Sequence, residues 1–285
     1  MILVSKYIPS QGGIEIATAL LVNELLKRNH SIVIVTSMEK SSVQYEANKN
    51  IKIFRFPKNK RLIPPWEGYY FMRRHLSDIQ KISDEENVDI INIIHQNGAS
   101  SWSYQLDGKF NIPIITTVHT LLCADHRFLS WRFSLIEPFR RLLHIYPILW
   151  FEKRSLQSSN YLIAISNMLY NYCSDIRDDS NIRLVPNPIN FGQFNTDVKP
   201  KNIDSGGAFR VLCSGRFSPE KGQIYLIKAM AKVSKSIPIH LFLLGGGSEK
   251  YKQKLEVEVR KLGIEKIVHF MDPIPHNKVP ALYKT

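Results

Sequence analysis

The chain has 285 residues and a formal net charge of +13, with 44% hydrophobic and 22% charged residues. This mixture is that of a globular protein and excludes a disordered or fibrous one, and the length suffices for two α/β domains. The three cysteines, Cys123, Cys173 and Cys213, lie far apart without a Cys-x-x-Cys pair, which excludes a disulfide framework and favours reduced thiols in a cytoplasmic protein.

The apolar runs of the sequence are short. None approaches the roughly 18 residues that cross a bilayer, and the N-terminal run Ile2–Val4 is too short for a signal peptide. A basic chain attracts phosphate-bearing partners such as nucleic acid, anionic lipid or a nucleotide diphosphate. No recognised nucleic-acid module appears, so we expect no nucleic-acid partner.

The first 198 residues alternate short apolar runs with helical patterns, which predicts a parallel sheet with helices on its faces. The predicted strands are Ile2–Val4, Ser31–Thr36, Ile51–Phe56, Asp89–Ile94, Ile112–Val118, Tyr161–Ile165 and Ile182–Val185. The predicted helices are Glu15–Arg28, Tyr69–Glu86, Glu137–Ser155 and Asn167–Ser174. The Ile and Val content of the strands is typical of strands that are buried on both faces.

Residues 199–207 are polar and without periodicity, which predicts a linker between a domain at 1–198 and a second one at 208–285. The strand–helix alternation then restarts. Its predicted elements are strand Arg210–Ser214, helix Glu220–Ser234, strand Ile239–Leu244, helix Glu249–Leu262, strand Ile267–Phe270 and a helix that begins near Asn277. About three strands make a small sheet, because such sheets usually carry ~4–6 strands.

Glycine-rich turns follow several of these strands. Gly12 and Gly13 precede the first helix, where paired glycines allow close approach of a ligand and a helix N-terminus favours negative charge. A plain tight turn explains them equally well, since the Gly-x-Gly-x-x-Gly fingerprint is absent. Gly245, Gly246 and Gly247 follow a strand of the second domain, and a flexible turn is again the structural alternative.

Two basic residues follow the first strand of the second domain. Gly215 ends this strand, Arg216 projects from its carboxyl end, and Lys221 is predicted in the first turn of the next helix. A cation there opposes the helix dipole unless an anion lies between the two side chains. Open α/β sheets bind ligands at the carboxyl ends of strands, which favours an anion site over two solvated surface cations.

Six short motifs together resemble the retaining family 4 glycosyltransferases, whose fold is GT-B. These motifs are Gly12-Gly13, Thr117-Val118-His119, Ala164-Ile165-Ser166, Val185-Pro186-Asn187-Pro188, Gly215-Arg216 with Lys221-Gly222, and Gly245-Gly246-Gly247. The resemblance runs from the first residues to Thr285, and it implies two Rossmann-like α/β domains with parallel sheets. It also implies transfer of a hexosyl group from a nucleotide diphosphate sugar to a glycan or lipid-linked acceptor, in cell-surface polysaccharide or glycolipid synthesis.

The resemblance assigns roles to single residues. Arg216 and Lys221 would bind the donor diphosphate, together with Gly215, Gly245, Gly246, Gly247, Gly12 and Gly13, and His119 would act near the transferred sugar. Cations that stabilise a leaving diphosphate need no metal ion, and the sequence has no carboxylate cluster to hold one, so we expect no cofactor. His95, which follows the predicted strand Asp89–Ile94, could line the same binding cleft as His119 or have a structural role. Asn187 is predicted to shape its loop.

Members of the family continue past this point into a loop with two glutamates, separated by seven residues, that act on the donor. Only Lys284 and Thr285 follow Tyr283, so the resemblance implies an incomplete second domain. Two alternatives to a transferase stay open. One is a truncated product that only binds nucleotide or acceptor, and the other is a different sugar-nucleotide enzyme on this scaffold, such as an epimerase.

The stretch Leu121–Arg154 is rich in aromatic and basic residues, and Lys58–Arg61 and Arg73–Arg74 add further bases. Basic-aromatic helices bind anionic membrane surfaces, so one hypothesis places the protein peripherally on the inner membrane face. The alternative is an amphipathic core helix whose bases face water. The members of the stretch are Trp131, Phe133, Phe139, Arg140, Arg141, Tyr146, Trp150, Phe151, Lys153 and Arg154.

Overall fold

The structure is a computed structural model of the whole chain. It divides into two compact units, Met1–Ile189 and Asn190–Thr285, which are described separately. The residues that the structure describes are 1–9, 12–39, 42–59, 62, 66–95, 101–121, 146–194, 197, 199 and 206–284.

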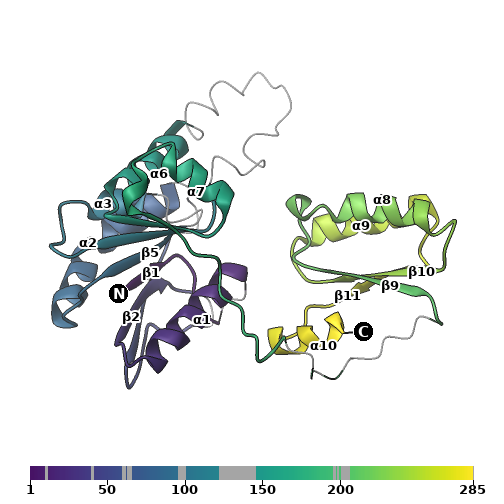
Figure 1. The fold of residues 1–285 in the computed structure, drawn as a ribbon, viewed down its shortest axis with the longest axis horizontal. Coiled ribbons are helices and arrows are strands. Elements are labelled where there is room, and N and C mark those ends of the chain that lie inside the picture. The colour runs from purple at the N-terminus through teal and green to yellow at the C-terminus, as the bar shows by residue number, and fades with distance from the viewer. Residues whose placement is uncertain are drawn as a thin grey trace. The chain divides into compact units, whose positions relative to one another are not determined.

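The first unit contains an eight-stranded sheet in the order β3-β4-β2-β1-β5-β6-β7-β8 (Figure 1). All neighbouring strands are parallel except β3 and β4, which form an antiparallel pair. The elements are β1 Ile2–Val4, α1 Gly13–Lys27, β2 Ile32–Ser37, β3 Tyr45–Asn48, β4 Ile51–Phe56, α2 Trp66–Glu85, β5 Ile91–His95, α3 Trp102–Leu106, β6 Ile114–Val118, α6 Tyr146–Ser158, β7 Tyr161–Ala164, α7 Asn167–Ser174 and β8 Ile182–Leu184. From β1 the chain first builds the sheet towards β4 and then returns to β5, so the strand order reverses between β1 and β5.

Helices cover the two faces of this sheet unequally. Alternate residues of a strand point to opposite faces, so Ile2 packs under α1 whereas Leu3 packs under α2 and α3. Val118 continues the second of these faces, where α6 and α7 cover it. Figure 1 shows α1 on one side of the sheet and α2, α3 and α6 on the other. Within the described ranges, α1 is the one helix on its side; Ile94 of β5 belongs to its apolar cluster, whereas Thr117 of β6 and Ile163 of β7 line a cavity there.

Most predicted elements of the first unit are confirmed within a few residues, but β3 and α3 were missed. Strand β3 is exposed along its length and pairs with β4 through a tight hairpin, in which Lys49 adopts a left-handed backbone with φ +42°. Helix α3 has only five residues, and tertiary contacts hold it: Trp102 is buried and its indole Nε1 donates to the Gly68 carbonyl at 3.0 Å. The predicted helix Glu137–Ser155 is described only from Tyr146 onward.

The second unit contains a parallel three-stranded sheet in the order β11-β10-β9. Its elements are β9 Phe209–Ser214, a 3-10 turn Pro219–Lys221, α8 Gln223–Val233, β10 Ile239–Leu244, α9 Glu249–Leu262, β11 Val268–Met271, a 3-10 turn His276–Lys278 and α10 Val279–Tyr283. The predicted helix Glu220–Ser234 is therefore split. Gly222, with φ +69°, ends the first 3-10 turn, because a residue in the left-handed region cannot continue a helix.

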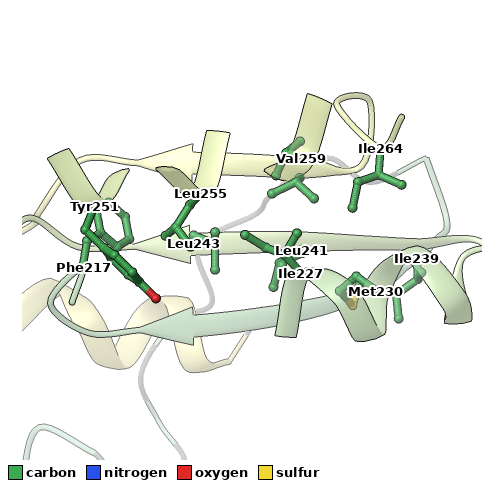
Figure 2. Packing of buried hydrophobic residues seen from close by; sticks show 11 residues of the cluster. Phe217, Ile227, Met230, Ile239, Leu241, Leu243, Tyr251, Leu255, Val259 and Ile264 are labelled. Carbon is green, nitrogen blue, oxygen red and sulfur yellow. The ribbon is translucent and has the colours of Figure 1, made fainter. Parts of the chain in front are cut away.

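Helices α8 and α9 pack on one face of the small sheet through a single apolar cluster. Figure 2 shows Leu241 and Leu243 of the central strand beside Ile227 of α8 and Leu255 of α9. All four of these side chains are fully buried. Burial of a Leu or Ile side chain contributes about 1.5–3 kcal/mol, so this cluster supplies a core for the strand ends described below.

The described helices are not apolar over a length that could cross a bilayer. The predicted linker at 199–207 lies partly outside the described residues, and the contacts divide the chain nearer to residue 190. The predicted domain bounds, and an incomplete second domain, stay predictions.

Candidate functional site

In the first unit the candidate residues lie at the carboxyl edge of the sheet, where the strand order reverses. Gly12 and Gly13 follow β1, His95 ends β5, and His119 follows β6, so all come from three neighbouring strands. Such a reversal point is where open α/β sheets bind ligands. The first unit thus brings its predicted residues to one edge.

The double-glycine turn leads directly into α1. Gly12 is the N-cap of this helix and has an extended backbone, with φ −156°. A Cβ atom on Gly12 would collide with the Glu15 side chain, whereas Gly13 has open space around it. The Glu15 carboxylate lies in the first turn of α1 and is only 8% exposed. Because this charge already occupies the positive end of the helix, the turn suits an uncharged ligand group better than a phosphate.

The two histidines lie on opposite sides of the sheet edge. His95 has the same strand parity as Ile93, on the side of α2 and α3, and its Nδ1 donates to the Thr120 carbonyl at 3.1 Å. This bond leaves the lone pair on Nε2, which is buried and has no partner in the described part of the chain. Burial lowers the pKa of His95, and the charge of Glu152 on α6 opposes that shift.

His119 points instead into a cavity of about 840 Å³ on the α1 side of the sheet. Thr117 and Asn187 line the same cavity. The Nδ1 atom of His119 is buried and, among the described residues, has no hydrogen-bond partner. Burial, with a smaller contribution from His95, lowers the pKa of His119 to about 4. At neutral pH a neutral imidazole is able to accept a hydrogen bond from a sugar hydroxyl or to donate one to it.

We expect His119 to stay neutral at about pH 6 in the folded chain. Its unfolded pKa is about 6.5, so between about pH 6.5 and 4 the unfolded chain binds more protons, and the free energy of unfolding falls as the pH falls through this window. Ring NMR titration checks the pKa, and denaturant unfolding at several pH values checks the linkage. His119→Gln should reduce the pH slope. A His119 that titrates near 6.5 would contradict the burial that we describe.

In the second unit the loop that follows β9 and begins at Gly215 is hydrogen-bonded to the loop that follows β10 and contains Gly245–Gly247. We call these two segments the tied loops. The Phe217 amide donates to the Gly246 carbonyl at 2.7 Å, and the Ser248 amide donates to the Phe217 carbonyl at 3.2 Å. A Cβ atom on Gly245 would collide with the Gly215 backbone, and one on Gly247 would lie 2.7 Å from the Phe217 carbonyl oxygen. These glycines are therefore required for loop packing, whatever ligand the loops bind.

The tied loops hold Arg216 at the carboxyl end of β9. Its backbone carbonyl accepts a 2.9 Å hydrogen bond from Gln223 Nε2, and its guanidinium, in a side chain that is 63% exposed, contacts Glu220 Oε1 at 3.2 Å. Lys221 is also exposed. The prediction that Lys221 lies in the first turn of the next helix is wrong, because Gly222 separates it from α8, which begins at Gln223.

Sequence reasoning missed Glu220 as the partner of Arg216 and Glu152 as a buried charge. The i, i+4 spacing of Arg216 and Glu220 was a usable signal. Nothing in the local sequence indicates that Glu152 is buried, where it accepts from the Tyr172 hydroxyl at 3.2 Å.

No three His, Cys, Asp or Glu side chains gather as a metal site anywhere in the ranges that the structure describes. His119, Gly12 and Gly13 belong to the first unit. Arg216, Lys221 and the remaining glycines belong to the second.

Two α/β units with parallel sheets, each carrying glycine turns at strand carboxyl ends, define the GT-B class of glycosyltransferase fold, as predicted. The chain belongs to Glycosyltransferase Family 4, whose model matches residues 11–193. A second model, Glycosyl transferases group 1, matches residues 195–285.

Solved structures with the same fold include sucrose-phosphate synthase from Thermosynechococcus elongatus, with a TM-score of 0.77 and 18% identity, over 99% of this chain and 72% of that one. HepE of Anabaena in complex with UDP-glucose has a TM-score of 0.66 and 17% identity, over 98% of this chain and 70% of that one. Alpha-monoglucosyldiacylglycerol synthase of Streptococcus pneumoniae is 23% identical over 292 residues, which are 98% of this chain and 62% of that protein. The chain thus spans less than two thirds of this relative.

Proposed function

We propose that the protein transfers a hexosyl group, with retention, from a nucleotide diphosphate sugar to a glycan or lipid-linked acceptor in cell-surface polysaccharide or glycolipid synthesis. The observation that carries this proposal is the pair of tied glycine loops, which hold Arg216 at the carboxyl end of a parallel strand. Family membership supports it.

Arg216 and Lys221 bind the donor diphosphate in this proposal. Rupture of the sugar–phosphate bond leaves negative charge on the departing diphosphate, and cations held in advance by the loops stabilise that charge without a metal ion. The Arg216 carbonyl accepts a hydrogen bond from Gln223, which fixes the backbone position from which the Arg216 side chain extends. His119, held neutral by burial, contacts a hydroxyl of the transferred sugar.

The comparisons favour particular partners. The HepE structure contains UDP-glucose, and the pneumococcal relative is named for a glucosylated diacylglycerol. We therefore propose a UDP-sugar as the donor, a lipid or lipid-linked glycan as the acceptor, and a place of action at the inner membrane face. A protein that acts on these partners works beside anionic lipid, and its net charge of +13 attracts such a surface.

The test is a panel of UDP- and GDP-sugars, incubated with the chain and with lipid or glycan acceptors. Release of nucleoside diphosphate together with a new glycoside reports transfer, and NMR of the anomeric proton reports retention. Tight nucleotide binding without turnover would favour the alternative of a binding protein. Return of the sugar nucleotide with an inverted centre would favour an epimerase. A chain that binds none of the nucleotides would refute the donor site.

A further inference from the structure

Helices α2, α3 and α6 form one continuous aromatic layer in the first unit. Tyr69 of α2 lies 5.2 Å from Phe151 of α6, and Trp150 of α6 lies 5.2 Å from both Phe151 and Tyr104 of α3, measured between ring centroids. Trp66 of α2 meets Phe151 edge-on at 5.7 Å. Segments that are more than thirty residues apart in sequence thus meet through their rings. We call Tyr70, Tyr104, Tyr146, Leu149 and Trp150, which are the exposed members and neighbours of this layer, the aromatic surface.

The aromatic surface exposes much large apolar area. Tyr146 is 61% exposed, Tyr70 51%, Trp150 47%, and Tyr104 and Leu149 37% each. Single exposed apolar residues are ordinary on proteins, but neighbouring ones of this size mark surfaces that bind a partner or a membrane. The residues come from three helices that already pack on one another, so they form a prearranged surface.

Helix α6 shows how the surface is separated from the core. Ile148, Phe151 and Leu156 are buried, whereas Tyr146, Leu149, Trp150, Lys153 and Arg154 are exposed. The exposed set recurs at i, i+3, i+4, i+7 and i+8, which is one face of a helix. The helix is therefore an amphipathic core helix whose outer face carries aromatic and basic residues instead of purely polar ones. The two interpretations of the sequence, a membrane-binding helix and an amphipathic core helix, are therefore compatible for α6.

Positive charge lies beside the aromatic rings. The Arg154 guanidinium carbon lies 5.8 Å above the Trp150 ring, and Arg73 Nη1 donates to the Tyr69 hydroxyl at 3.2 Å. The acidic Glu67 of α2 forms an ion pair with Lys58, in which Glu67 Oε1 lies 3.1 Å from Lys58 Nζ. Lys153 adds a further exposed base on the same face of α6. The combination of bases and rings complements a negatively charged, partly apolar partner.

We propose that this aromatic surface docks on an anionic lipid bilayer. Trp and Tyr rings prefer the headgroup region, where one end is apolar and the other hydrated. Each base near an anionic leaflet strengthens binding about fivefold, which is the ~1 kcal/mol of such a contact converted to an affinity ratio. Docking would bring the proposed transferase to a lipid-linked acceptor. The purpose of the docking therefore rests on the proposed function. Binding itself needs neither donor nor acceptor.

The test is co-sedimentation of the whole chain with vesicles of phosphatidylcholine containing phosphatidylglycerol, against vesicles of phosphatidylcholine alone, at low salt. We expect binding to the anionic vesicles. The triple variant Trp150→Ala, Lys153→Gln, Arg154→Gln should bind at least about tenfold more weakly. The matched control, Tyr225→Ala, Lys254→Gln, Lys261→Gln, removes one exposed aromatic ring and two exposed bases from α8 and α9, and it should bind like the wild type.

Brominated lipids provide a second measurement. They should quench the fluorescence of the wild type more than that of Trp150→Phe, because Trp150 is the exposed indole of the described surface. If the triple variant loses its thermal transition, the charge-only pair Lys153→Gln, Arg154→Gln replaces it. Equal losses in the triple and control variants, or no anionic binding by the wild type, would overturn the proposal. Thermal shift with UDP is read separately, so failure of docking and failure of the donor site are distinguishable.

Discussion

Replacing Arg216 or Lys221 by alanine is expected to weaken the binding of a nucleoside diphosphate about tenfold or more in each variant. Hydrogen bonds to charged groups contribute about 1.5–3 kcal/mol, and pairs between guanidinium or ammonium groups and phosphates belong to this class. We expect the lower end for Arg216, because its side chain is 63% exposed and water screens the interaction. Isothermal titration with UDP and GDP measures the effect.

Two comparisons make this result specific. Lys232→Ala removes an exposed base from the last turn of α8 and should leave the affinity unchanged. Glu220→Gln removes the carboxylate that contacts Arg216 at 3.2 Å and should tighten diphosphate binding about two- to fivefold, since an exposed pair contributes at most about 1 kcal/mol. Unchanged affinity in both Arg216→Ala and Lys221→Ala would refute the donor-site assignment.

Gly245→Ala is expected to reduce the free energy of unfolding of the second unit by at least about 2 kcal/mol. Gly245 has φ +156°, and an added Cβ would lie 2.9 Å from the Gly215 carbonyl carbon, which is backbone and cannot turn aside. The tied loops would have to separate, so Arg216 would lose its fixed position and diphosphate binding would weaken as well. Urea denaturation of the whole chain, followed by circular dichroism, measures the stability change.

Gly215→Ala is the matched control for stability. Its added Cβ would meet no atom within 4 Å, and Gly215 is not in the left-handed region. We expect its midpoint of unfolding to lie close to that of the wild type. If Gly245→Ala is equally well tolerated, the close packing of the two loops is not what the structure describes.

Much of the fold could be predicted from the sequence because buried parallel strands are locally encoded. Ile2–Val4, Ile51–Phe56 and Ile239–Leu244 were predicted with the bounds that they have. Ile2–Val4 is apolar and buried at every position, and the other two strands are mostly apolar although they include Lys52, Arg55 and His240, so composition alone indicates them. β3 is exposed and contains Glu46, Ala47 and Asn48, so only its pairing with β4 reveals it.

The candidate site was less predictable. The sequence indicated which strand ends carry His95, His119 and Arg216, because glycine turns and polar residues follow apolar runs there. It could not indicate that His95 and His119 point to opposite sides of the sheet, since that depends on the register of β5 and β6, in which His95 pairs with Val118 and not with His119. It also misplaced Lys221, because the backbone conformation of Gly222 is set by how the 3-10 turn joins α8.

The sequence by itself determined the class of protein: two α/β domains with glycine turns after their strands, in the pattern of Glycosyltransferase Family 4. Only the tertiary structure decided the burial that keeps His119 neutral, the contact between Arg216 and Glu220, and the meeting of Tyr69, Tyr104 and Trp150 in one aromatic layer. The physical reason is range. Propensity and hydrophobic period act over a few neighbouring residues, whereas burial and ring contacts join segments that only the folded chain brings together.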